Sequence, residues 1–463
     1  MKTDTIAAIA TALSDSGIGI IRISGENAWN AANKIFQTKN GKHPLMEFES
    51  HTIHYGYIVD EDQILDEVMI SVMKAPRSYT REDTVEISCH GGVLLLQKVL
   101  DAVIKNGARL AEPGEFTKRA FLNGRIDLAR AEAVMDLIRS KNDFALRASV
   151  SQLKGSVSEE IKSLRAIILY EIAFIESALD DPEHISTEGY AQKLSQIVDR
   201  LIVRLKKLLD SAEDGRLRKE GINTVIVGKP NAGKSSFLNL LMGEDRAIVT
   251  DVAGTTRDTL EESIRLKGIG LNIVDTAGIR STEDVVEKIG VDRAKKYAAD
   301  ADLIVYVVDS SMPLDENDRQ IIEMIKRKRN IILLNKTDLE AVVTEEQLTD
   351  LFGKENGELS VIRTSAVDRT GMEEFEAEIQ RMFCHGMLAN DDEIVITNIR
   401  HKEAIRDAYQ SILQVKSSVE QEMPEDFYSI DLMSAYSSLG TIIGEEVGED
   451  LVNEIFSKFC MGK

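Results

Sequence analysis

Hydrophobic and polar residues follow three different patterns along the chain. Up to about residue 118, short runs rich in β-branched residues, such as Ile18–Ser24, Asp66–Met73 and Thr84–Ser88, are separated by glycine-containing turns. One segment of this region, Val93–Lys105, has the spacing of an amphipathic helix. This mixture predicts a compact α+β domain over residues 1–118.

From residue 119 onward the apolar positions repeat with the period of a helix. Leu128, Ala131 and Met135 fall on one helical face, and similar faces continue to about residue 215. The same pattern returns near the C-terminus. We therefore predict an α-helical domain built from two segments, residues 119–215 and 384–463.

Between these segments, over residues 216–383, apolar strands alternate with helices. The runs Asn223–Val227, Leu271–Val274, Ile331–Leu334 and Val361–Arg363 are mostly apolar, and their alternation with helices is typical of a parallel sheet. This pattern predicts an inserted α/β domain. Insertion is reasonable because the two ends of a domain often lie close together at its surface.

The charge of the chain narrows the choice of partners. Its 463 residues include 56 basic and 78 acidic ones, which gives a formal net charge of −22. A general affinity for nucleic acid depends on a basic surface. Any contact with RNA is therefore expected to be local, or to be made mostly through a partner protein.

The cysteines and the apolar runs indicate the compartment. Cys89, Cys384 and Cys460 have no paired or metal-ligand spacing, as expected in a reducing environment. No run approaches the roughly 20 apolar residues of a membrane span. The apolar segment Ile6–Leu13 leads directly into Ile18–Ser24, so we expect two folded strands rather than a leader peptide. The expected location is the cytoplasm.

A phosphate-binding loop follows the first strand of the inserted domain. The loop runs from Gly228 to Ser235, includes Gly233 and Lys234, and directly precedes the helical run Ser236–Met242. The glycines let successive backbone N–H groups face phosphate oxygens. Lys234 adds a cation, and Ser235 offers a hydroxyl group to Mg²⁺. The strand, loop and helix together predict a P-loop nucleotide site.

Further motifs in the expected order indicate guanine. Asp275–Gly278 ends a strand and places a carboxylate near the metal, and Thr256 offers a second hydroxyl ligand. Asn335–Asp338 follows another strand, and the ionised carboxylate of Asp338 can accept both N–H groups of guanine. Ser365 and Ala366 complete the set, although alone they are typical of an ordinary turn.

The residues expected around GTP are Asn231, Ala232, Gly233, Lys234, Ser235, Ser236, Thr250, Asp251, Val252, Ala253, Gly254, Thr255, Thr256, Asp275, Thr276, Ala277, Gly278, Asn335, Lys336, Thr337, Asp338, Ser365 and Ala366. Many small GTPases place a water-orienting glutamine directly after the position of Gly278. Here that residue is Ile279, which cannot hydrogen-bond a nucleophile. Hydrolysis must therefore use another residue or an ion.

Four segments outside the inserted domain make the pattern specific. They are Gly17–Gly25, Glu82–Ile87 with His90–Gly92, Pro113–Leu128 and the terminal Phe459–Lys463. Combined with the guanine motifs, they make the chain resemble the tRNA modification GTPase family, MnmE or TrmE, over essentially its full length.

The resemblance implies that the N-terminal domain forms a homodimer and binds 5-formyl- or 5,10-methylene-tetrahydrofolate. The matching residues are Arg22, Glu86, Arg125 and Lys463. A carboxylate suits the donor edge of a pterin, and cations suit the carboxylates of folate. Taken singly and without the resemblance, each of these residues is more typical of a surface ion pair. Cys460 is a candidate catalytic thiol, and the alternative is a packed helix end.

The resemblance also accounts for the missing glutamine. Family members use a bound K⁺, which here matches the side chain of Asn231 and the backbone oxygens of Thr250, Val252 and Thr255, while Ser235 and Thr256 hold Mg²⁺. Glu287 is the matching candidate to orient water, with Arg280 nearby. Alternatively, Glu287 is an ordinary acidic residue of a first helical turn.

As a whole, the resemblance implies a K⁺-stimulated, Mg²⁺-dependent GTPase. With an FAD-dependent MnmG-type partner in a heterotetramer, it would add a carboxymethylaminomethyl-type group at C5 of the wobble uridine of certain tRNAs. Tetrahydrofolate would supply the one-carbon unit. Two alternatives stay open: a ribosome-assembly or signalling GTPase without folate chemistry, and a folate-dependent aminomethyl-transferring enzyme regulated by GTP.

Overall fold

The structure is a computed structural model that describes residues 4–41, 45–140, 142–243, 262–266, 269–274, 301–353, 359–383, 394–460 and 462. Contacts divide the chain into two units. The first unit combines residues 1–139, 149–205 and 403–463, and the second combines residues 140–148 and 206–402.

The N-terminal part of the first unit is a seven-stranded sheet with the strand order β3-β4-β5-β6-β2-β1-β7. Neighbouring strands are antiparallel except β1 and β7, which are parallel. The strands are β1 (Ile6–Ile9), β2 (Gly19–Ser24), β3 (Phe36–Gln37), β4 (Thr52–Asp60), β5 (Gln63–Met73), β6 (Thr84–Cys89) and β7 (Arg109–Leu110). The expected pair of strands at the start of the chain is thus present as β1 and β2.

Two helices, α1 (Ala28–Ile35) and α2 (Val93–Lys105), pack against this sheet, and a short 3₁₀ helix, η1 (Leu45–Glu47), precedes β4. Side chains alternate across β2, so Ile21 and Ile23 enter the core. The amphipathic spacing of Val93–Lys105 places Leu96 and Val99 against the sheet. The α+β character predicted for this region is confirmed.

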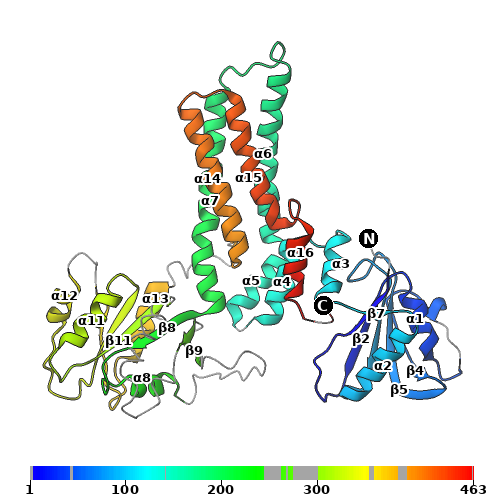
Figure 1. The fold of residues 1–463 in the computed structure, drawn as a ribbon, viewed down its shortest axis with the longest axis horizontal. Helices are drawn as coiled ribbons and strands as arrows, with labels where there is room; N and C mark the ends of the chain where they lie inside the picture. The colour runs from blue at the N-terminus through cyan, green and yellow to red at the C-terminus, as the bar shows by residue number, and fades with distance from the viewer. Residues whose placement is uncertain are drawn as a thin grey trace. The chain divides into compact units, whose positions relative to one another are not determined.

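Helices make up the rest of the first unit. They are α3 (Glu115–Leu122), α4 (Leu128–Arg139), α5 (Asp143–Lys154), α6 (Ser156–Asp180), α7 (Tyr190–Glu220), α14 (Ile399–Glu420), α15 (Glu425–Ile443) and α16 (Glu449–Ser457), of which α5, α7 and α14 also extend into the second unit. Helices α6, α7, α14 and α15 lie side by side (Figure 1). Lys416 of α14 pairs with Asp199 of α7 at 2.7 Å, so helices from both ends of the chain are in contact, as an interrupted helical domain requires.

The second unit contains a six-stranded sheet with the order β13-β12-β11-β8-β10-β9, which is parallel apart from the β9–β10 hairpin. The strands are β8 (Ile222–Val227), β9 (Glu262–Leu266), β10 (Ile269–Ile273), β11 (Leu303–Asp309), β12 (Asn330–Asn335) and β13 (Val361–Arg363). The predicted parallel sheet is confirmed.

Helices cover both faces of this sheet. Helices α8 (Lys234–Leu241) and α13 (Met372–Phe383) pack on one face, and α11 (Glu316–Ile325) and α12 (Glu345–Phe352) on the other. Over the residues that the structure describes, we find no helix both long and apolar enough to cross a membrane.

Candidate functional site

The P-loop joins the end of β8 to the start of α8. Gly228 has φ of +153° and Gly233 has φ of +100°, so both lie in a region that favours glycine. A Cβ atom on Gly233 would lie 1.9 Å from the Nδ2 atom of Asn335, whose amide donates to the carbonyl oxygen of Ala232 at 2.9 Å. The end of β12 therefore fixes the position of the P-loop.

Lys234 carries a charge that no described carboxylate neutralises. Its Nζ atom donates to the backbone oxygens of Gly228 and Lys229, both at 2.7 Å. Burial lowers the pKa of its ammonium group, because leaving water disfavours the charged form. A partly buried cation at a helix N-terminus fits an anionic group such as a phosphate.

The guanine motif lies at the carboxyl ends of the neighbouring strands β12 and β13. Ser365 donates through Oγ to Oδ1 of Asp338 at 2.8 Å, and Asp338 is exposed. Lys336 has φ of +63° and pairs with Asp309 at 2.6 Å. Thr337 donates to the carbonyl oxygen of Thr364 at 3.1 Å. Two motifs far apart in sequence, Asn335–Asp338 and Ser365–Ala366, thus form one surface, which we call the guanine wall. The Ser365 hydroxyl group holds its exposed carboxylate in place.

Sequence reasoning missed Asp309 in this wall. This residue ends β11, between the P-loop strand β8 and the strand β12 that carries the guanine motif. Its position at the carboxyl end of a buried parallel strand was the signal that could have identified it, because ligands of such sheets bind at that edge.

Some expected site residues lie outside the described ranges. They are Thr250, Asp251, Val252, Ala253, Gly254, Thr255, Thr256, Asp275, Thr276, Ala277, Gly278, Arg280, Glu287 and Lys463. The described part of the nucleotide site therefore consists of the P-loop and the guanine wall.

A second cluster lies in the first unit, where Arg22 and Glu86 face each other on β2 and β6. The two residues are paired in the strand register and form an ion pair of 2.7 Å. Arg22 also donates through Nη1 to the carbonyl oxygen of Gly462 at 3.2 Å. The C-terminal tail therefore lies against the N-terminal sheet and brings Gly462, the neighbour of Lys463, to this pair.

Tyr79 connects this cluster to Arg125. The guanidinium carbon of Arg125 lies 4.7 Å from the centre of the Tyr79 ring, and that of Arg22 lies 5.5 Å from it. The Tyr79 hydroxyl group is 2.9 Å from that of Thr117. Tyr79 was not among the expected site residues, because nothing in its sequence context distinguishes it from a structural tyrosine. The structure thus brings Arg22, which is paired with Glu86, and Arg125 to the same ring.

The two described cysteines of the first unit differ in access. Cys89 is buried, which raises the pKa of its thiol to about 11 and makes it a poor nucleophile. Cys460 is exposed, while Phe456 and Phe459 next to it are buried. The packed helix end considered for Cys460 is therefore formed by the phenylalanines, and the thiol itself does not pack.

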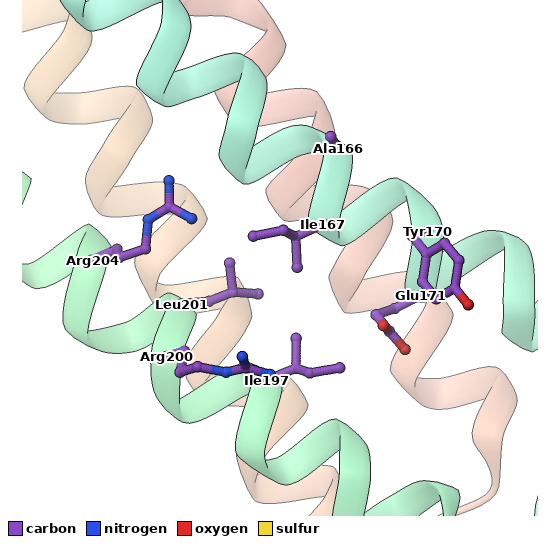
Figure 2. Close-up of a pocket in the computed structure, with 8 residues that line it drawn as sticks. All are labelled: Ala166, Ile167, Tyr170, Glu171, Ile197, Arg200, Leu201 and Arg204. Atoms are coloured by element: carbon purple, nitrogen blue, oxygen red, sulfur yellow. The ribbon is translucent and has the colours of Figure 1, made fainter.

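Residues of α6 and α7 line a hollow of about 450 Å³, and Figure 2 shows how their side chains lie. Ile167, Ile197 and Leu201 form its apolar middle. Arg204 lies at one end and donates to Glu160 at 2.9 Å, and Glu171 at the other end accepts from Tyr190 at 3.0 Å. These charges are satisfied inside the helical bundle, unlike that of the P-loop lysine.

Comparisons with known proteins cover both regions. A model described as the GTP-binding protein TrmE N-terminus matches residues 5–125, and one described as the MnmE helical domain matches residues 128–460. The tRNA modification GTPase MnmE of Lachnoclostridium phytofermentans is 58% identical over 100% of both chains, and that of Clostridioides difficile is 49% identical over 99% of each. The structure of Aquifex aeolicus Era bound to GDP·AlF4⁻ covers 42% of this chain and 67% of its own, with 27% identity and a TM-score of 0.27, which is too low to establish a shared fold.

A parallel sheet with a P-loop after its first strand, and a guanine motif at the same edge, defines a P-loop GTPase. The matches over nearly the whole length go further. The chain belongs to the MnmE family of tRNA modification GTPases, also called TrmE.

Proposed function

We propose that this protein is a K⁺-stimulated, Mg²⁺-dependent GTPase that modifies tRNA. With an FAD-dependent MnmG-type partner in a heterotetramer, it adds a carboxymethylaminomethyl-type group at C5 of the wobble uridine. The observation that carries the proposal is the 58% identity over the full length with a tRNA modification GTPase. The net charge of −22 suggests that most RNA contacts come from the partner.

In the nucleotide site, Asp338 reads guanine and Lys234 binds phosphate oxygens. Ser235 and Thr256 hold Mg²⁺, which neutralises charge on the phosphates when bound. Asn231 fits a K⁺ ligand, because its exposed amide lies in the P-loop itself, and the backbone oxygens of Thr250, Val252 and Thr255 complete that set. Glu287 orients water, with Arg280 beside it.

In the folate site, Glu86 accepts from the pterin, while Arg22, Arg125 and Lys463 bind carboxylates. The geometry suits this assignment, because Arg22, Glu86 and the tail at Gly462 meet at hydrogen-bonding distances. The bound 5-formyl- or 5,10-methylene-tetrahydrofolate supplies a one-carbon unit, and Cys460 is the nearby thiol. Two copies of the N-terminal domain form the homodimer.

The domain boundaries belong to the same proposal. Residues 1–118 form the folate and dimerisation domain, residues 119–215 and 384–463 the helical domain, and residues 216–383 the GTPase domain. A ribosome-assembly or signalling GTPase would need only the last of these. The hydrogen bond from Arg22 to the C-terminal tail favours a tRNA modification GTPase over this alternative, because a ribosome-assembly or signalling GTPase does not require such a site.

The proposal is tested in a strain that lacks this gene. We expect wobble uridines of certain tRNAs to lose the C5 group, as measured by mass spectrometry of digested tRNA. The full chain should restore the group, and a Lys234→Ala variant should not. Fully modified tRNA in the deletion strain would reject the proposal.

A further inference from the structure

A shallow depression of about 470 Å³ lies in the first unit. Arg77, Arg81 and Arg125 line it together with His51 and Tyr79, and its lining contains no aspartate or glutamate. The three arginines are exposed. Three guanidinium groups around one concave surface repel each other unless an anion lies between them.

Neighbouring carboxylates do not neutralise this charge. Within the described part of the chain, Arg77, Arg81 and Arg125 form no ion pair, and Arg81 donates only to the carbonyl oxygen of Asn123 at 2.9 Å. The acids that follow Arg81 in sequence are engaged elsewhere. Glu82 pairs with Arg119 at 3.2 Å, and Asp83 accepts from the backbone N–H group of Ala75 at 2.9 Å.

The depression shares Tyr79 with the surroundings of Arg22, a residue of the proposed folate site. Arg125 and Arg22 both lie near the ring of Tyr79, so their guanidinium groups are no farther apart than the sum of their distances to it. A ligand that starts at Glu86 and passes Arg125 therefore enters the depression.

We propose that this depression binds the γ-linked polyglutamate tail of the folate, an inference that rests on the folate site proposed above. Each added glutamate brings one free carboxylate, and a guanidinium group binds a carboxylate through two parallel hydrogen bonds. An open, basic surface suits a flexible tail that stays largely hydrated.

The alternative anion, an RNA backbone, fits less well. Single-stranded RNA is usually held by aromatic side chains on which its bases stack. Tyr79 is the one tyrosine, tryptophan or phenylalanine of the lining. Two guanidinium groups, those of Arg22 and Arg125, already lie near its ring. The net charge of −22 also opposes association with a polyanion as large as tRNA.

Calorimetry with mono- and pentaglutamyl 5-formyl-tetrahydrofolate tests the proposal on the full chain. We expect the wild type to bind the pentaglutamate about tenfold more tightly, because several exposed ion pairs each contribute a small amount. The double variant Arg77→Gln/Arg81→Asn should lose most of this difference and keep its affinity for the monoglutamate. Asparagine is chosen because Arg81 has φ of +62°, which asparagine tolerates. Lys98→Ala removes an exposed cation of α2 outside this lining and serves as the control.

The outcomes separate the two proposals. Equal affinity of the wild type for both folates overturns the tail site alone, and so does a double variant that loses both folates equally. Absence of binding by either folate to the wild type overturns the folate site and the tail site together. If the double variant keeps its preference for the pentaglutamate but binds tRNA more weakly, the depression is an RNA contact and the inference is wrong.

Discussion

Asp338 is exposed near the end of β12, and the Ser365 hydroxyl group holds one of its carboxylate oxygens at 2.8 Å. Ser365 donates to Oδ1 and not to Oδ2. The ionised carboxylate accepts hydrogen bonds without donating any. A change of one atom in this side chain should therefore change the choice of base and little else.

We expect Asp338→Asn to weaken GTP and to favour xanthosine triphosphate. An amide N–H₂ group would face the N–H groups of guanine, whereas xanthine presents a carbonyl oxygen at that place. The loss for GTP should be about 1.5–3 kcal/mol, as for other hydrogen bonds to a charged group. Competition binding with the two nucleotides measures it. An unchanged preference for GTP contradicts the role given to Asp338.

The choice of substitution matters at Asn231, because its backbone has φ of +62°. Alanine at this position would be strained by about 1–3 kcal/mol, so Asn231→Ala would confuse loss of the amide with distortion of the P-loop. Glycine adopts this conformation freely.

Asn231→Gly should therefore keep nucleotide binding, which depends on backbone N–H groups and Lys234. We expect the stimulation of GTP hydrolysis by K⁺ over Na⁺ to disappear. Turnover in the two salts at equal ionic strength provides the measurement, and nucleotide affinity is the control. A glycine variant that still responds to K⁺ like the wild type shows that the ion does not use this side chain.

At the scale of elements, a network of charges joins β7 and α3 to Asp4, which lies just before β1 in the first unit. Arg119 is buried and donates to Asp4 and Glu115 at 2.9 and 3.0 Å, and Arg109 donates to Glu115 at 2.5 Å. Burial raises the pKa of Glu115, but bonds from Arg109, the Glu112 backbone and Arg119 lower it on balance.

Glu115→Gln should destabilise this unit by about 1.5–3 kcal/mol at pH 7, since it removes one charged hydrogen-bond partner of Arg119 and Arg109, both of which keep their ion pair with Asp4. A carboxylate with a lowered pKa stabilises the folded state above the unfolded pKa of about 4.3, and this contribution is lost as the pH falls through the folded value. The difference between wild type and variant should therefore shrink below about pH 4. Trp29, the single tryptophan, is buried in this unit and reports its unfolding in urea by fluorescence.

Lys105→Gln is the matched control, because it removes an exposed ion pair with Asp60 in the same unit. We expect no measurable change from it at either pH. If the difference caused by Glu115→Gln stays constant from pH 7 to below pH 4, the carboxylate charge is not what stabilises these elements.

This network also shows where sequence reasoning ends. Periodicity predicted α2 with the observed ends, because one apolar face determines that helix. It placed the start of the P-loop helix at Ser236, whereas α8 begins at Lys234, since loop geometry rather than hydrophobicity sets that end. Nothing in the sequence around Arg119 indicated its ion pair with Asp4, which lies 115 residues earlier.

In the candidate sites, too, sequence motifs identified some residues, while others come together only through packing. Short motifs identified Lys234, Asp338 and Ser365, because the order of strand, loop and helix predicts their positions. The ion pair of Arg22 with Glu86 depended on the register of β2 and β6, and the depression on a loop arginine, Arg125, reaching the ring of Tyr79. Contacts of this kind depend on tertiary packing, which local patterns in a single sequence do not reveal.

At the scale of the whole molecule, the nucleotide site and the proposed folate site belong to different units of the chain. The P-loop and the guanine wall belong to the second unit, and the tail that reaches Arg22 belongs to the first. Cys460 accepts a hydrogen bond from the N–H group of Gly114 at 3.3 Å, so the tail is held at two points. Removing the tail should affect one chemistry and spare the other.

Deletion of Cys460–Lys463 should leave GTP turnover in K⁺ unchanged, weaken folate binding about ten- to a hundredfold, and abolish tRNA modification. The loss of affinity corresponds to one charge-assisted contact of about 1.5–3 kcal/mol, which we assign to Lys463. Phe456 and Phe459 remain buried, so the unit should stay folded, and Trp29 fluorescence checks this. Lys463→Ala separates the charge from the tail backbone, since it should reproduce the loss of folate affinity. Folate binding at wild-type strength after the deletion would refute the site, and loss of GTP turnover would show that the tail instead supports the fold or the dimer.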